Sequence, residues 1–151
     1  MPKQKTLMLL FTACLALLAL AACSSATAEQ PQLACWPAAG EVTGEYGWTR
    51  LGWRTGMQMQ LAEAAPVQSA AAGEVVSVEQ DAAGDTVAIE IDHGHKLRTR
   101  YALCGPALVA AGDEVQAGTV IAESGELFFS VRWDDVSYDP RDFLPKEAAA
   151  Q

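Results

Sequence analysis

The sequence predicts an all-β domain behind a flexible N-terminal tether. Several short stretches alternate apolar with polar side chains, which is the pattern of half-buried strands. The clearest are Gly56–Leu61, Glu74–Glu79 (with Val76 and Val78 on one face) and Thr86–Asp92. Glycine turns separate them, and no helical pattern of useful length is visible. Short strands at this density are typical of a compact all-β fold.

The stretch Gly125–Arg132 has two different faces when it is drawn as a strand. Leu127, Phe129 and Val131 share an apolar face, which predicts core packing. The other face mixes an acid, an aromatic ring, a hydroxyl and a base, namely Glu126, Phe128, Ser130 and Arg132. This mixture suits the floor of a cleft better than a second core, so we expect a groove over this strand.

The N-terminus has the features of a bacterial lipoprotein signal. Lys3 and Lys5 precede an apolar run from Leu7 to Ala22. The run does not exceed the minimum for a membrane-spanning helix, which needs roughly 17–25 residues. Its end, Leu20-Ala21-Ala22-Cys23, resembles the lipobox, whose cysteine is lipidated. An ordinary signal peptide, cut after a small residue with Cys23 incidental, is the alternative.

This signal sets the expected domain boundaries. We expect a signal peptide over 1–22, a lipidated flexible tether over 23–34, the β domain over 35–146 and a frayed tail over 147–151. Ser24, which stands after the cysteine in place of Asp, resembles the outer-membrane sorting pattern. We therefore expect an outer membrane lipoprotein that faces the periplasm.

The acidic composition excludes some partners. Ten Lys and Arg stand against nineteen Asp and Glu, which gives a formal net charge of −9 at pH 7. Removal of the signal takes away Lys3 and Lys5 and no acid, so the mature chain is more acidic still. We therefore expect no binding of nucleic acid and no docking on anionic lipid by charge. Membrane contact should come through acyl chains on Cys23 alone.

Two cysteines remain in the expected domain, Cys35 and Cys104. In an oxidising compartment, two thiols favour one disulfide. It would close a long loop and stabilise the fold by about 4 kcal/mol on the chain-entropy model. Two buried free thiols or a metal-binding pair are the alternatives, because sequence does not show proximity.

A series of short motifs resembles the LytM (lysostaphin-type) zinc endopeptidases. The first are Trp36-Pro37, Gly40, Val42-Thr43, Tyr46-Gly47, Pro66-Val67 and Ala72-Gly73-Glu74-Val75. They continue with Ile91-Asp92-His93-Gly94, Thr99, Tyr101-Ala102, Gly112-Asp113 and Ala117-Gly118. Together they cover about Trp36 to Pro145 in the order of the family. The resemblance implies a LytM-type β domain with a groove, of the duplicated-hybrid-motif or barrel-sandwich type. It also implies that members of the family act on the peptide crosslinks of peptidoglycan.

The positions that bind zinc in this family carry other side chains here. The family uses the His and Asp of His-x-Gly-x-Asp and the second His of His-x-His. Aligned on the motif glycine, the first two positions are Arg54 and Gln58. The His-x-His pair becomes Glu126 and Phe128, and a further catalytic His after Tyr-Ala becomes Leu103.

These replacements remove the chemistry of the metal. A catalytic zinc ion needs about three protein ligands and an open position for water. Arg54 brings a permanent positive charge, Gln58 is a poor neutral ligand, and Phe128 offers no donor. Without the metal there is no Lewis acid and no bound water whose pKa is lowered to about 7. We therefore expect no catalytic residues, no cofactor and no zinc.

A different metal site is a weaker alternative. His93 and His95 have a spacing that can place both on one strand face, with Cys104 or Glu126 as further ligands. Two ligands at a turn rarely make a closed set. The simpler interpretation makes His93 a turn residue and His95 a solvated one.

The groove that remains has the usual form of a binding site, an apolar floor with a few polar groups. We expect Leu103 and Phe128 to line it, with Arg54 and Gln58 at its mouth. The sequence allows Trp48, Trp53 and Trp133 to line it as well, or to lie in the core or at the rim.

The resemblance also implies a role. Degenerate LytM domains, to which this chain is similar, serve as activators of peptidoglycan amidases in cell division and envelope remodelling. We expect a non-catalytic pseudoenzyme that binds a cell-wall hydrolase such as an amidase, or peptidoglycan itself. The alternative is a zinc metalloendopeptidase that cleaves peptidoglycan crosslinks with rearranged ligands.

Overall fold

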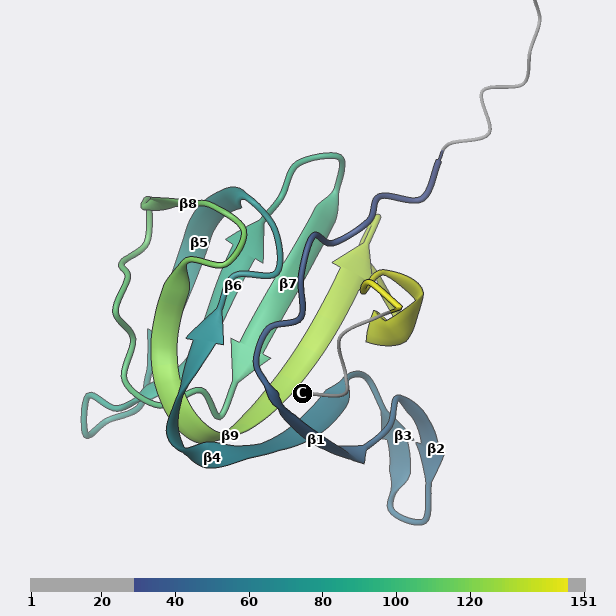
Figure 1. Ribbon diagram of the computed structural model, residues 1–151, viewed down its shortest axis with the longest axis horizontal. Helices are drawn as coiled ribbons and strands as arrows, with labels where there is room; N and C mark the ends of the chain where they lie inside the picture. The colour runs from purple at the N-terminus through teal and green to yellow at the C-terminus, as the bar shows by residue number, and fades with distance from the viewer. Residues whose placement is uncertain (1–28, 147–151) are drawn as a thin grey trace, which may run out of the picture. The chain divides into compact units, whose positions relative to one another are not determined.

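The computed structural model describes residues 29–146 (Figure 1). The predicted signal peptide, the lipidation at Cys23 and the tail 147–151 lie outside these residues. Strands make up almost all of the regular structure, as the sequence predicted. They are β1 (Gly40–Gly44), β2 (Gly47–Thr49), β3 (Gly52–Arg54), β4 (Met57–Gln68), β5 (Gly73–Gln80), β6 (Thr86–Asp92), β7 (Leu97–Ala102), β8 (Glu114–Val115), β9 (Val120–Trp133) and β10 (Val136–Tyr138), followed by a 3-10 helix, Pro140–Asp142.

The long strand β9 organises the main sheet. The sheet has the order β1-β4-β9-β7-β6-β5-β8, and all of its pairings are antiparallel. Along one edge β9 pairs first with β4 and then with β10, and along the other it pairs with β7. β2 and β3 form a separate two-stranded hairpin that projects from the body of the sheet (Figure 1).

The predicted apolar face of β9 is confirmed as core. Leu127, Phe129 and Val131 are all 0% exposed. Phe129 packs against the ring of Tyr101 on β7, with ring centroids 5.2 Å apart, and pairs with Met57 on β4. Burial of each large apolar side chain of this kind stabilises the fold by about 1.5–3 kcal/mol. The core therefore fixes which face of β9 is turned away from it.

Strand β5 differs from the alternation predicted for it. Val75 is fully buried and Val76 is 39% exposed, so Val76 and Val78 do not share a face. The cause is a β-bulge, since Val75 pairs with Ile91 but Ser77 pairs with Glu90. The extra residue reverses the phase of the side chains, and Val78 packs against the core in place of Val76.

The folded unit begins before residue 35. Leu33 is buried in the core, and its N–H donates a hydrogen bond to the carbonyl of Phe143 at 2.9 Å. The N–H of Ala34 donates to the carbonyl of Ala70 at 2.8 Å. The last residues of the expected tether therefore belong to the domain. Within residues 29–146, no helix is long and apolar enough to cross a membrane.

Candidate functional site

The polar face of the sheet, opposite to the core, carries the predicted site residues. Gln58 on β4 pairs with Phe128 on β9, and Phe128 pairs with Ala102 at the end of β7. Directly paired residues of adjacent strands point to the same side of a sheet. Three strands from distant parts of the sequence thus bring the predicted positions together.

Gln58 and Glu126 form a direct contact on this face. Gln58 Nε2 donates a hydrogen bond to Glu126 Oε1 at 2.6 Å. The backbone N–H of Glu126 in turn donates to the hydroxyl of Ser124 at 3.2 Å. The carboxylate of Glu126 therefore has a neutral partner, where the family has a metal ligand beside a catalytic histidine.

The ring of Phe128 covers Gly56, which directly precedes β4. A β-carbon at Gly56 would lie 2.8 Å from Cζ of Phe128, inside the contact limit. The absence of a β-carbon at Gly56 therefore lets the ring approach the backbone just before β4. Phe128 is only half-buried in this position, so part of its ring remains open to a partner.

Arg54 lies beside Gln58 at the end of the hairpin. Its guanidinium packs over Gly44, so closely that a β-carbon there would overlap it, and the same β-carbon would lie 3.1 Å from Cβ of Gln58. Arg54 is half-buried, and no carboxylate in the part of the chain that the structure describes forms an ion pair with it. A cation without a counter-charge therefore stands at the predicted mouth.

Leu103 lies at the border of the site. It follows Ala102 directly and has a left-handed backbone, with φ of 57°. Its side chain is 52% exposed, and its carbonyl accepts a hydrogen bond from the hydroxyl of Ser124 at 2.9 Å. The structure therefore gathers Arg54, Gln58, Glu126 and Phe128, with Leu103 exposed next to them.

The side chains at the family's metal positions do not fit a zinc ion. A guanidinium, an amide and a phenyl ring stand where zinc needs imidazole, thiolate or carboxylate donors. Among residues 29–146, no group of three or more His, Cys, Asp or Glu is close enough together to hold a metal.

The two histidines predicted as an alternative metal pair have different surroundings. His93 Nδ1 lies 2.8 Å from the carbonyl of Ala72, and Nε2 lies 2.7 Å from Thr99 Oγ1. Because a carbonyl only accepts, Nδ1 carries the proton and Nε2 accepts from the threonine hydroxyl, so neither nitrogen is left for a metal. Burial lowers the pKa of His93. His95 is exposed in the turn. His93 has a structural role, because it links Ala72 to Thr99 through its two ring nitrogens.

The link at His93 continues into the core. Thr99 Oγ1 lies 3.2 Å from the hydroxyl of Tyr101, and that hydroxyl accepts a hydrogen bond from the N–H of Ala70 at 2.9 Å. Burial raises the pKa of Tyr101 to about 12. The segment from Ala70 to Ala72 is thereby held to β7 at both ends.

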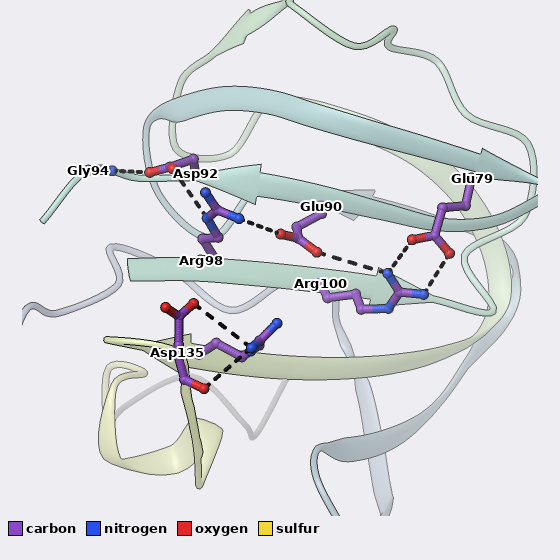
Figure 2. A network of polar contacts seen from close by, with 8 residues as sticks. Glu79, Glu90, Asp92, Gly94, Arg98, Arg100 and Asp135 are labelled. Carbon is purple, nitrogen blue, oxygen red and sulfur yellow. Dashed lines mark hydrogen bonds and ion pairs between the residues drawn. The ribbon is translucent and has the colours of Figure 1, made fainter. Parts of the chain in front are cut away.

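A network of charged side chains extends the polar face over β5, β6 and β7 (Figure 2). Arg100 makes a bidentate pair with Glu79 at 2.6 and 2.8 Å, and its Nη1 lies 4.0 Å from Glu90. Arg98 contacts Glu90 and Asp92, each at 3.3 Å. Partly exposed pairs of this kind are worth about 0.2–1 kcal/mol each. Their main effect is that Arg98 and Arg100 are neutralised, whereas Arg54 is not.

The predicted disulfide is not formed, since Cys35 and Cys104 are both free thiols. Cys35 Sγ contacts the carbonyl of Ser69 at 3.3 Å, and Cys104 Sγ lies 3.9 Å from the carbonyl of Gly105. Burial raises the pKa of both thiols. Each cysteine therefore packs as a small apolar residue with its own carbonyl neighbour.

The tryptophans do not gather as a set at the predicted groove. Trp133 packs with Tyr138 and Phe143, at centroid distances of 6.0 and 6.3 Å, on the side of the core. Trp48 and Trp53 lie on the projecting β2–β3 hairpin and are largely exposed. Sequence spacing could not separate these environments, because both depend on tertiary contacts.

A comparison with known protein families identifies the family of this domain. The sequence profile described as peptidase family M23 matches residues 52–140. The chain belongs to peptidase family M23. The matched residues include Arg54, Gln58, Leu103, Glu126 and Phe128, so all the replaced positions lie inside the M23 domain.

Two relatives of this M23 chain are lipoproteins. The lipoprotein YgeR of Escherichia coli (strain K12) is 31% identical over 121 residues, which are 76% of this chain and 48% of YgeR. Outer membrane antigenic lipoprotein B of Haemophilus influenzae is 30% identical over 118 residues, which are 74% of this chain and 29% of the relative. The chain thus spans about half the length of YgeR and less of the second relative.

Solved structures show the same fold. Lysostaphin in solution has a TM-score of 0.65 at 21% identity, over 79% of this chain and 58% of that one. A chain of the SpoIIQ–SpoIIIAH pore-forming complex has a TM-score of 0.67 at 19% identity, over 78% of this chain and 94% of that one. The predicted LytM (lysostaphin-type) β domain is therefore confirmed as the fold.

Proposed function

We propose that this M23 domain is non-catalytic and binds a peptidoglycan hydrolase, of the amidase class, through the polar face at Arg54, Gln58 and Phe128. The observation that carries the proposal is the set of side chains at the metal positions. An arginine, a glutamine and a phenylalanine form a recognition surface in place of a zinc site.

Charge and shape support this use of the face. Arg54 is half-buried without a counter-charge among the described residues, whereas Arg98 and Arg100 nearby are neutralised. Arg54 and Phe128 both adjoin Gln58. Arginine is enriched among interface hot spots, and aromatic residues including phenylalanine are enriched in interface cores. The partner is therefore expected to bring an apolar side chain onto Phe128 and a carboxylate to Arg54.

The envelope location is part of the same proposal. The relatives YgeR and antigenic lipoprotein B carry lipoprotein names. We propose that residues 1–22 are a signal peptide, that Cys23 carries acyl chains, and that the domain works at the outer membrane facing the periplasm. A membrane-held activator would keep its hydrolase close to the wall, and peptidoglycan itself is the second candidate ligand of the face.

The test is binding of residues 24–151 to purified amidases of the same organism, measured by calorimetry together with dye release from labelled sacculi. We expect Arg54→Glu and Phe128→Asp to abolish binding and stimulation while the melting curve stays cooperative. Truncation of a hot-spot residue costs about 2 kcal/mol or more, which is at least about thirtyfold in affinity.

Matched controls separate the face from general effects. Arg50→Glu makes the same charge change four residues away on the exposed tip of the hairpin, and Phe128→Leu keeps an apolar side chain. Both should bind nearly as the unsubstituted chain does. Undiminished binding by Arg54→Glu and Phe128→Asp would exclude the face, and binding to sacculi alone would assign it to peptidoglycan.

A further inference from the structure

The β2–β3 hairpin presents apolar side chains to solvent outside the proposed site. Trp48 is 83% exposed, Leu51 at the tip is 99% exposed, and Trp53 is 50% exposed. Single exposed apolar residues are common, but a cluster on a projecting hairpin marks an interaction surface. The M23 face described above does not use this cluster.

The hairpin is built as a stiff aromatic row. Trp48 and Trp53 pair across the two strands with ring centroids 5.5 Å apart, and Trp53 meets Tyr46 at 5.3 Å, both edge to face. The hydroxyl of Tyr46 donates to the carbonyl of Ser137 at 2.9 Å, which fixes the base of the row to β10. The row of rings therefore runs from Tyr46 at the base of the hairpin to Trp53 and across to Trp48 on the paired strand.

The tip is held in a fixed turn. The hydroxyl of Thr49 donates to the carbonyl of Gly52 at 2.7 Å and accepts from the N–H of Leu51 at 3.2 Å. These bonds hold the turn that presents Leu51 to solvent. The hairpin should lose little conformational entropy on binding, because its turn and its aromatic rings are held in position before a partner arrives.

The charge of the hairpin is opposite to that of the chain. Arg50 and Arg54 lie between Tyr46 and Ala62, a segment without any Asp or Glu, in a protein of net charge −9. Glu45, at the base, is already paired with Arg141 at 2.7 and 2.9 Å. The net charge therefore hides a local cationic patch around the aromatic row.

We propose that the β2–β3 hairpin inserts its tip into the surface of a phospholipid membrane. Its three kinds of side chain match the three layers of that surface. Leu51 reaches the acyl chains, Trp48 and Trp53 occupy the headgroup region that tryptophan prefers, and Arg50 meets the phosphates. A sugar or a protein surface would not need a fully exposed aliphatic tip ahead of the tryptophans.

The length of chain before the domain makes a weak insertion effective. Seven residues separate Cys23 from Pro31, the start of the compact unit. The eight steps from Cys23 to Pro31 span at most about 29 Å when the chain is fully extended. A short tether gives an effective concentration on the order of millimolar, so a contact too weak to recruit a free protein still holds a tethered one. Under this proposal the hairpin contacts the membrane in addition to the acyl chains that the net charge led us to expect as the sole contact.

The test uses residues 24–151, which retain the whole core from Leu33 to Leu144. An amino-terminal histidine tag holds the chain on nickel-lipid vesicles of phosphatidylethanolamine and phosphatidylglycerol, so the readout does not depend on lipidation or on a hydrolase. Brominated acyl chains quench tryptophans that reach the bilayer surface. We expect clear quenching of the unsubstituted chain, and about threefold less for Leu51→Ser, which keeps every tryptophan.

Leu108→Ser is the matched control, because Leu108 is 59% exposed on another part of the domain. It should be quenched as strongly as the unsubstituted chain, while Trp48→Ser should lose most of the quenching. Equal emission over brominated and plain lipid would overturn the proposal, and so would unchanged quenching of Leu51→Ser. Loss of sacculus or amidase binding by Trp48→Ser, without any quenching of the unsubstituted chain, would assign the hairpin to that ligand.

Discussion

Gln58 and Glu126 meet across β4 and β9, with Nε2 of the amide 2.6 Å from Oε1 of the carboxylate. They stand at the positions where the M23 pattern has an Asp ligand and the first His of His-x-His. The contact supports the view that the strands keep the spacing of a metal site although the ligands have been replaced. Restoring the ligands tests this view directly.

The triple variant Arg54→His, Gln58→Asp and Phe128→His should gain a zinc site. The pairing of residues 58 and 128 already places two of the three side chains on adjacent strands. We expect about one zinc ion per chain in the variant and near-zero zinc in the unsubstituted chain, by elemental analysis of tag-free protein. A folded triple variant without zinc would contradict the spacing, and stoichiometric zinc in the unsubstituted chain would favour the metalloendopeptidase alternative.

Stability should fall in mild acid because of His93. Burial lowers its pKa, so the folded state favours the neutral ring, while the unfolded pKa is about 6.5. The contribution is complete above the unfolded pKa and is lost as the pH falls through the folded one. Nearby Asp92 acts in the opposite direction. Urea unfolding between about pH 7.5 and pH 5 measures the slope.

His93→Gln should flatten that slope and reduce stability near neutral pH by about 1–3 kcal/mol, because buried hydrogen-bond partners are lost. His95→Gln is the control, since His95 is exposed in the turn. An equal change of slope in both variants would show that the dependence comes from elsewhere.

Tyr101→Phe should cost about 1–3 kcal/mol at pH 7, because the N–H of Ala70 loses its buried acceptor. Tyr138→Phe keeps the ring contacts with Trp133 and Phe143 and should cost less than about 0.5 kcal/mol. In alkali the difference in unfolding free energy between the unsubstituted chain and Tyr101→Phe should become smaller. The folded pKa of Tyr101 is about 12 against about 10 unfolded, so its contribution is lost as the pH rises through that range. Denaturant midpoints of each variant at pH 7 and in alkali measure the difference.

The free thiols can be counted. Without reductant, denatured residues 24–151 should react with a thiol reagent at both Cys35 and Cys104, because no disulfide joins them. The native protein should react slowly, since burial raises the pKa of both thiols and keeps them protonated. Failure to detect thiols after denaturation would show that the two cysteines do pair.

The sequence was sufficient to predict which side chains are buried wherever the alternation of apolar and polar residues was regular. Leu127, Phe129 and Val131 were predicted to be core and are, because the register of β9 with its neighbours has no shift over this stretch. The same rule failed at Val76, because a bulge is set by the partner strand and leaves no clear mark in the sequence. Motif spacing placed Arg54, Gln58, Glu126 and Phe128 in one region, and the structure brings them together.

Features that depend on pairs across strands were not predicted. The network from Glu79 through Arg100 to Glu90 requires the register of three strands, and sequence alone leaves that register open. The exposure of Trp48 was equally hidden, because alternation gives the same pattern for a hairpin that packs on the body and for one that projects. The disulfide was predicted from compartment alone, which does not tell whether two thiols meet.

Strand β9 is paired on both sides at Phe128, and this limits the conformational entropy that the domain loses when a partner binds. Phe128 pairs with β4 on one side and with Ala102, the last residue of β7, on the other, while Glu126 pairs with β4. The backbone beneath both side chains is therefore already held by sheet hydrogen bonds. When a partner docks there, most of the conformational entropy lost on binding is that of the partner, and little is that of this domain. Selection acting on such a surface can exchange one side chain for another without redesigning the support, which is how a peptidase scaffold can lose its metal and keep its architecture.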